Sequence, residues 1–255
     1  MDLNTVTTFR RPTCREELRL APGEVLLGGG TWLFSEPQRA VTGLVDLTSL
    51  GWPPTQLLHD GSLRIAGTCT VAELMGSPHL GALAPLVHQA GEALLMSFKV
   101  QRSATVGGNV ALALPAGAMI SLATALAGVA VVWTPDGGER REPVAELVRG
   151  VRTTSLVPGE VLRAIDLPPG VLTARTGFRR AALTPNGRSS AVVIGVEDRI
   201  TVTASTTRPV LLTRQRYDEE LAAVDCWYDD PHGRADWRAA VTTQLTRSLV
   251  RELTS

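Results

Sequence analysis

Ala104-Thr105-Val106-Gly107-Gly108-Asn109-Val110 is a short polar and glycine-containing stretch between a basic segment and an uncharged, mostly apolar run that reaches Trp133. Two adjacent glycines let the backbone bend and leave amide groups unshielded by side chains. Such a segment predicts a concave surface of N–H donors that suits an anion, for example a diphosphate. Thr105 adds a hydroxyl donor to this surface.

A second segment of the same chemistry, Leu27-Gly28-Gly29-Gly30-Thr31, follows a short apolar run far upstream and also ends its glycines with a threonine. Neither segment fits the G-x-G-x-x-G turn of dinucleotide-binding proteins or the P-loop, since Gly30 is followed by Thr31-Trp32-Leu33 without a further glycine or lysine. Each segment alone is also compatible with an ordinary tight turn that binds no ligand. The two together carry the functional hypothesis.

Six segments, in the same order along most of the chain, resemble the FAD-binding subunit of molybdenum hydroxylases of the xanthine dehydrogenase and carbon monoxide dehydrogenase type. The matching segments are Leu27-Gly28-Gly29-Gly30-Thr31-Trp32-Leu33, Gly43-Leu44-Val45-Asp46-Leu47, Leu63-Arg64-Ile65-Ala66-Gly67-Thr68, the stretch from Ala104 to Val110, Gly159-Glu160-Val161-Leu162 with Ile165-Asp166-Leu167-Pro168, and Phe178-Arg179-Arg180.

This resemblance implies an α+β fold with three parts. Two subdomains, residues 1–51 and 52–155, form an FAD-binding fold of the two-glycine-loop (PCMH/VAO-like) type. Residues 156–255 form a C-terminal antiparallel sheet with helices. The sequence pattern agrees with this organisation, because short alternating strands are predicted for residues 161–167, 177–183, 190–196 and 200–205, and helices for residues 214–223 and 236–253.

Local signals predict several further elements. Thr70 and Glu73 have the spacing of a capping box at the start of a helix. The uncharged run predicts a buried helix over about residues 116–127, ended by Gly128, and then a strand over residues 129–133. This run is long enough to cross a bilayer, but Pro115, Gly117 and Gly128 break it, so we predict no membrane span.

The resemblance also implies which residues bind FAD. The first loop contributes Gly28, Gly29, Gly30, Thr31 and Trp32, and the second contributes Ala104, Thr105, Val106, Gly107, Gly108 and Asn109. Leu162 and Arg179 match positions where the third domain approaches the flavin ring. A cation at Arg179 would stabilise negative charge on reduced flavin; the alternative is an ordinary solvated arginine. Neither loop contains a histidine, so non-covalent FAD is expected.

Three positions depart from the family pattern. Ala118 stands where relatives commonly have an aspartate that reaches the flavin nucleotide, and Trp32 replaces a smaller, often polar residue. Gln101-Arg102 replaces a usual Arg-Asn pair. Losing one polar contact weakens binding by about 1 kcal/mol. Trp32 either offers an aromatic face to the cofactor, packs in the core, or partly fills the site.

Composition excludes other classes of function. Lys+Arg and Asp+Glu are equal at 25 each, so no basic excess points to nucleic acid or to an anionic membrane surface. Cys14, Cys69 and Cys226 are isolated, so this chain alone lacks the ligands for zinc or an iron–sulfur cluster. Free thiols and the absence of a leader pattern in Met1-Asp2-Leu3-Asn4-Thr5 predict a cytoplasmic protein.

The expected function is electron transfer within a heterotrimeric molybdenum hydroxylase. By resemblance, substrate is oxidised on a large molybdopterin-binding partner, electrons pass through 2Fe–2S clusters on a small partner, and FAD on this chain delivers them to NAD, oxygen or another acceptor. Two alternatives remain: a flavin-free structural subunit of such a complex, and a stand-alone FAD-dependent oxidase or dehydrogenase. The second alternative needs a base near the flavin, which the sequence does not reveal.

Overall fold

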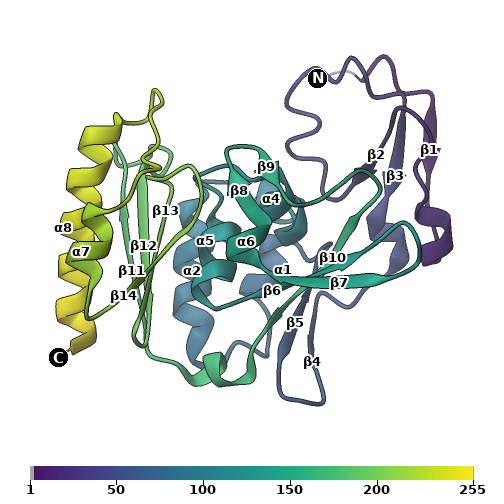
Figure 1. Ribbon diagram of the computed structural model, residues 1–255. Helices are drawn as coiled ribbons and strands as arrows, with labels where there is room; N and C mark the ends of the chain where they lie inside the picture. Colours follow the sequence, from purple (N-terminus) through teal and green to yellow (C-terminus); the bar gives the residue numbers. More distant parts are fainter. Residues whose placement is uncertain (1–2, 255) are drawn as a thin grey trace.

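The computed structural model describes residues 3–254, so Met1 and Asp2, which the leader-sequence prediction includes, lie outside the described residues. The chain forms three successive layers of structure from the N-terminus, at the right of Figure 1, to the C-terminal helix at its left. Each layer is built around its own sheet. The predicted α+β fold is confirmed.

The first layer is a small parallel sheet in the order β1-β3-β2, made of β1 (Thr8–Arg10), β3 (Gly43–Asp46) and β2 (Glu24–Leu27). The 3-10 helices η1 (Arg15–Leu18) and η2 (Leu47–Leu50) flank it. Arg10 of β1 reaches Glu24 of β2 through two hydrogen bonds of 2.8 and 2.6 Å. This ion pair ties together the two outer strands.

The second layer is a five-stranded antiparallel sheet with helices on one face. Its strands, in spatial order, are β4 (Thr55–Leu57), β5 (Leu63–Ala66), β10 (Val161–Leu167), β6 (Val129–Trp133) and β7 (Glu139–Pro143). The helices are α1 (Val71–Met75), α2 (Ala84–Ala93), α3 (Phe98–Gln101), α4 (Val106–Leu112), α5 (Ala118–Ala125) and α6 (Val144–Leu147). Two 3-10 helices, η3 (Gly81–Leu83) and η4 (Pro169–Thr173), and a small ladder of β8 (Val148–Gly150) and β9 (Thr153–Thr154) complete it.

The third layer is an antiparallel sheet of β11 (Thr176–Ala181), β12 (Ala191–Val196), β13 (Arg199–Thr203) and β14 (Val210–Thr213), followed by α7 (Tyr217–Ala222) and α8 (Ala235–Thr254). Helix α8 covers its outer face, while α2 and α5 lie on the inner face (Figure 1). This sheet is therefore covered on both sides.

The structure corrects the placement of one predicted strand. Residues 161–167 do form a strand, but β10 pairs with β5 and β6 at the centre of the second layer instead of joining the C-terminal sheet. Strand β14 was not predicted. The capping box is confirmed: the Thr70 side chain accepts a hydrogen bond from the Glu73 N–H, and the Glu73 carboxylate accepts one from the Thr70 N–H.

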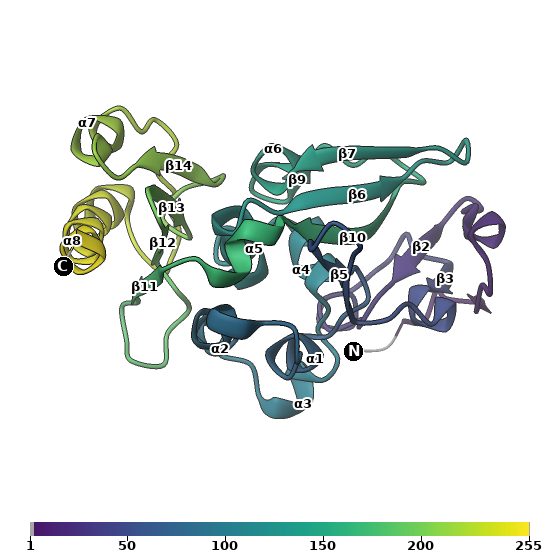
Figure 2. The ribbon, with the colours of Figure 1, turned by 90° about the horizontal axis from the view of Figure 1, so that it is seen from below.

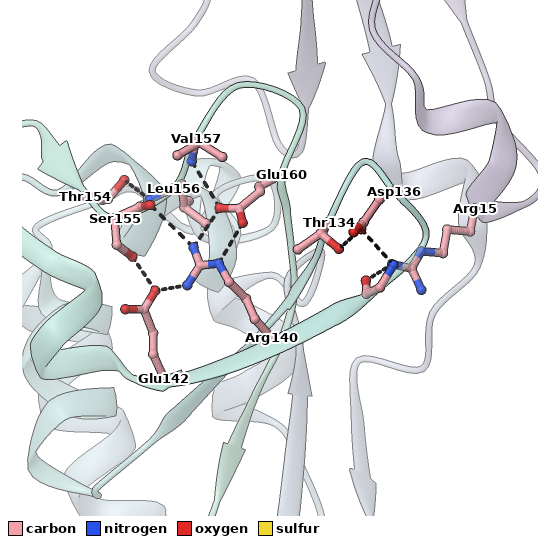
Figure 3. Close-up of polar contacts among 11 residues, drawn as sticks. Arg15, Thr134, Asp136, Arg140, Glu142, Thr154, Ser155, Leu156, Val157 and Glu160 are labelled. Atoms are coloured by element: carbon pink, nitrogen blue, oxygen red, sulfur yellow. Dashed lines mark hydrogen bonds and ion pairs between the residues drawn. The ribbon is translucent and has the colours of Figure 1, made fainter.

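A polar network fixes the segment that leads into β10 (Figure 3). Arg140 on β7 donates two hydrogen bonds of 2.6 Å to Glu160 and also pairs with Glu142. Glu160 in turn accepts a bond of 3.0 Å from the Val157 N–H. The hydrogen bonds from Arg140 lower the pKa of Glu160 below its usual value. Arg140 thereby holds the segment that leads into β10 against β7.

Candidate functional site

The two glycine loops, remote in sequence, lie against each other. The first loop leaves the carboxyl end of β2 and packs its glycines on the segment that precedes α4. A Cβ atom placed on Gly29 would lie 1.5 Å from the backbone oxygen of Ser103, and one on Gly28 would lie 2.9 Å from Thr105 Oγ1. A side chain at Gly29 is incompatible with this approach, so the glycines allow the two backbones to meet.

The second loop is also the first turn of α4, which the sequence did not predict because glycines are poor helix formers. Thr105 is the N-cap, and its Oγ1 accepts a hydrogen bond of 3.0 Å from the Gly108 N–H. Thr105 is only 3% exposed, while Gly108 is exposed. Ala104 is buried, and its carbonyl accepts a bond of 2.9 Å from the Val71 N–H.

The backbone donors of the second loop are already used within the protein. Val106 donates to the carbonyl of Cys69 at 2.8 Å, and Gly107 donates to that of Gly67 at 3.0 Å. The Asn109 N–H donates to the Thr105 carbonyl at 3.0 Å. The expectation of free amide donors is therefore wrong for this loop. This loop therefore offers a ligand only its backbone surface and the side chains of Thr105 and Asn109.

The first loop differs in this respect. Among residues 3–254, no hydrogen bond is donated by the backbone N–H groups of residues 29–33. Thr31 is exposed, and Gly30 adopts a left-handed conformation with φ of 69°. Successive unpaired N–H groups after a strand are suited to an anion. The unpaired backbone donors of the two loops are therefore on the first loop.

Asn109 is held in place by the next helix. Its Oδ1 accepts a hydrogen bond of 3.1 Å from the Met119 N–H, which leaves its amide NH₂ without a partner among the described residues. Ala118, one of the predicted departures from the family pattern, is the first residue of α5 and is only 2% exposed.

Trp32 lies at the other end of α4. Its ring is 5.7 Å from the Arg152 guanidinium, and the Arg152 N–H donates to the carbonyl of Ala113, the residue that ends α4. The indole Nε1 is buried and has no hydrogen-bond partner among residues 3–254. The first loop thus extends from the N-cap of α4 at Thr105 to its C-terminal end.

Leu162 lies near the second loop, but it belongs to the second layer. It lies on the central strand β10 and is 6% exposed. A Cβ on Gly67 would lie 2.1 Å from the Leu162 carbonyl oxygen, and the Gly67 carbonyl accepts the Gly107 N–H. Leu162 therefore supports the loop from beneath, and its expected location in the third domain is wrong.

Arg179 faces away from the glycine loops. On β11 it forms an ion pair with Glu252 of α8, and its Nη1 donates to the Phe178 carbonyl at 2.9 Å. Its expected role beside the flavin stays a prediction, and in this structure the side chain pairs with α8. The next residue, Arg180, lies on the opposite face and donates to Ser189 Oγ at 2.7 Å. Alternation along a strand makes a one-residue shift change the face.

The thiol next to the second loop is unreactive. Cys69 is 1% exposed, and burial raises the pKa of its thiol to about 12. It stays protonated at neutral pH, so its contribution is the backbone carbonyl that binds Val106. Among residues 3–254, no group of three or more His, Cys, Asp or Glu side chains is arranged to hold a metal ion.

The residues present fit an FAD diphosphate. The glycines of the first loop offer unpaired N–H groups, and the second loop adds two polar side chains without placing a carboxylate in the same position. A groove of about 1030 Å³ lies elsewhere, at the amino end of β2, between residues such as Leu18, Trp133 and Val161, and includes no residue of either loop.

Comparison with known proteins agrees with this geometry. The family model described as the FAD binding domain in molybdopterin dehydrogenase matches residues 14–170, which include both loops and β10. The chain belongs to this family. No curated protein matches it.

Solved structures share the fold of this molybdopterin dehydrogenase family member over almost its whole length. Quinoline 2-oxidoreductase from Pseudomonas putida 86 superposes with a TM-score of 0.84 at 18% identity, covering 99% of this chain and 98% of that chain. Reconstituted CO dehydrogenase from Oligotropha carboxidovorans gives 0.84 at 21% identity, covering 98% of each. Carbon monoxide dehydrogenase from Hydrogenophaga pseudoflava, in a form lacking the Mo-pyranopterin moiety, gives 0.82 at 20% identity and 96% of each.

No helix within residues 3–254 has both the length and the apolar character that crossing a membrane requires.

Proposed function

We propose that this chain is the electron-transferring FAD subunit of a molybdenum hydroxylase complex. The direct packing of the first glycine loop on the segment that opens α4 supports this proposal most strongly, since Gly29 leaves no room for a side chain against Ser103. FAD, when bound, supplies the redox chemistry. The residues of this chain bind and orient it.

The roles of the loop residues follow from their contacts. The N–H groups of residues 29–33 bind the diphosphate, and Thr105 and Asn109 add polar contacts. Gly107 lets the second loop pack closely on the backbone of Gly67. These residues carry no group that takes or gives a proton near neutral pH. This composition suits a subunit that relays electrons and leaves substrate chemistry to a partner.

The partners are inferred from the family and from the names of structural relatives, which include CO dehydrogenases with a molybdenum cofactor. We propose a large molybdopterin-binding chain and a small 2Fe–2S chain, assembled with this one as a heterotrimer in the cytoplasm. Electrons leave the flavin for NAD, oxygen or another acceptor.

One observation favours a second candidate, a structural subunit without flavin. Trp32 lies at the end of α4 with its indole N–H buried, and Ala118 lacks the carboxylate that relatives commonly have. Purification of the full chain followed by a visible spectrum distinguishes the two. Flavin absorbance, present at once or after soaking with FAD, supports the main proposal; its absence in both preparations supports the structural subunit.

A further inference from the structure

The central strand β10 contains a bulge at Arg163. In its pairing with β6, Leu162 lies opposite Val132 and Ala164 lies opposite Val131, so Arg163 is the extra residue without a partner on β6. Figure 2 shows β10 with α4 on one side and the first-layer strands β2 and β3 on the other. A bulge moves one residue out of the ladder and changes which side chains face each side of the sheet. This bulge therefore decides which side chains β10 presents to α4 and which to the first layer.

The bulge divides the side chains of β10 between two cores. Leu162 and Ile165 pack in the core that also contains Val106 of α4. Val161 instead packs in the core that the first layer shares with β10. Side chains alternate along a regular strand, so without the bulge residue 163, and not residue 162, would share the face of Ile165. A regular β10 would thus turn the side chain of residue 163 into the core beside α4.

The charge of Arg163 is compatible only with the bulged strand. Its guanidinium lies 4.2 Å from the Trp52 ring and 5.5 Å from the Trp133 ring, and both rings pack at the joint between the first and second layers. Its Nη1 is buried and has no hydrogen-bond partner among residues 3–254. Burial lowers the pKa of the guanidinium, but an arginine remains charged at neutral pH. Since burying this charge among the apolar side chains beside α4 is strongly unfavourable, the cation stays against the tryptophan rings, which attract it.

The backbone of the bulge supports the second glycine loop. The Arg163 carbonyl accepts a hydrogen bond of 2.8 Å from the Gly67 N–H, and the Gly67 carbonyl accepts one of 3.0 Å from the Gly107 N–H. A Cβ on Gly107 would lie 2.7 Å from the Gly67 Cα, so the two backbones are in direct contact. A shift of the Arg163 carbonyl would therefore move Gly67 and, with it, the second loop.

We propose that Arg163 is a positioning residue of the flavin site. Its charge fixes the bulge in β10, the bulge places the Arg163 carbonyl against Gly67, and Gly67 holds the second glycine loop in place. This inference rests on the proposed function, in which the two loops bind FAD. The Arg163 side chain lies at the joint of the first and second layers, so it acts through the backbone of Gly67 and not by contact with the flavin.

The test compares four variants of the full chain. Arg163→Leu removes the charge, and Trp52→Leu removes the ring nearest to the guanidinium. Arg163→Lys keeps a cation on a long side chain. Arg15→Leu is the matched control, because the Arg15 guanidinium also lies on the Trp133 ring, at 4.6 Å, but donates its hydrogen bond to the carbonyl of Gly138 in the hairpin.

Two measurements are made on each flavin-free variant, well below its unfolding midpoint. The first is the Kd for FAD, from an absorbance titration. The second is hydrogen exchange, followed by mass spectrometry, of the peptides that cover residues 63–70 and 104–110. A residue that only adds global stability would lower the unfolding midpoint and leave both measurements as in wild type.

Arg163→Leu and Trp52→Leu are expected to raise the Kd for FAD about fivefold or more and to speed exchange in both peptides, while Arg163→Lys and Arg15→Leu stay within about twofold of wild type. Wild-type Kd and exchange in Arg163→Leu and Trp52→Leu overturn the proposal. An equal effect of Arg15→Leu, or faster exchange in Arg163→Lys, also overturns it. If Arg163→Leu does not fold, Trp52→Leu and Arg163→Lys decide. A wild-type chain that binds no FAD refutes the proposed function, and the exchange comparison then decides separately whether Arg163 positions the second loop.

Discussion

Substituting Gly29 by alanine tests the central contact between the two loops. The added methyl group would lie 1.5 Å from the Ser103 carbonyl oxygen, whereas real Cβ atoms essentially never come within 3.0 Å of another heavy atom in such a contact. Both groups near the clash belong to the backbone, so no side chain can rotate away. The first loop must therefore move away from the segment before α4 until the 1.5 Å separation is at least 3.0 Å.

Such overpacking typically costs about 1–3 kcal/mol. If the loops relieve it by separating, FAD binding weakens by a factor of about 5 to 150. The assay is titration of the flavin-free protein with FAD, followed by absorbance, together with a thermal melt of the flavin-free form. The variant is expected to keep its folded core, because the clash is at the edge of the first layer, and to bind FAD less tightly.

Two matched substitutions make the series quantitative. Gly107→Ala places its methyl 2.5 Å from the Gly67 carbonyl oxygen, a clash with backbone that is less severe than that at Gly29. Gly170→Ala has no atom within 4 Å and a backbone that any residue adopts, so it is expected to leave binding unchanged. FAD affinity for Gly29→Ala within threefold of wild type would refute the reasoning.

Three further outcomes are expected. The hydrogen bonds from Arg10 lower the pKa of Glu24 to about 2, so Glu24→Gln destabilises the protein at neutral pH, where the carboxylate is ionised. In urea melts, the difference in the free energy of unfolding between wild type and variant shrinks as pH falls from about 4.5 towards 2, because the carboxylate contributes only while ionised. A constant difference across that window would contradict this. Arg238 is 1% exposed and pairs with Asp230, so Asp230→Ala should lower the free energy of unfolding by about 3–5 kcal/mol by leaving a buried charge unpaired; a loss below about 1 kcal/mol would mean that water replaces the carboxylate. Arg179→Ala should leave the Kd for FAD within twofold of wild type, since the Arg179 side chain pairs with α8. A larger effect would indicate that Arg179 acts at the flavin site.

Local signals in the sequence predicted many of the elements. The Thr70 and Glu73 capping box forms as expected, since both partners lie within one helical turn. Strand β6 occupies the predicted residues 129–133, because an apolar β-branched run next to a Gly-Gly hairpin turn leaves few alternatives. The start of α4 at Val106 was missed, since its two glycines disfavour a helix until tertiary contacts hold them.

The facing of individual side chains was less predictable. Arg179 and Arg180 are adjacent, and a strand sends neighbours to opposite sides, so only the packing of α8 on one face and α2 on the other decides which arginine points where. Likewise, nothing local assigns β10 to a particular sheet. Its pairing with β5 and β6 depends on partners about 100 and 30 residues away.

The sequence by itself determined the family and the two loops, because glycine pairs, a following threonine and their order along the chain are local properties that survive any arrangement of the layers. Only the tertiary structure decided which donors remain for a ligand. The Val106 and Gly107 N–H groups bind carbonyls of Cys69 and Gly67, residues far outside their own loop. Hydrogen bonds satisfied over long range cannot be read from composition, since each depends on which backbone the fold brings within reach.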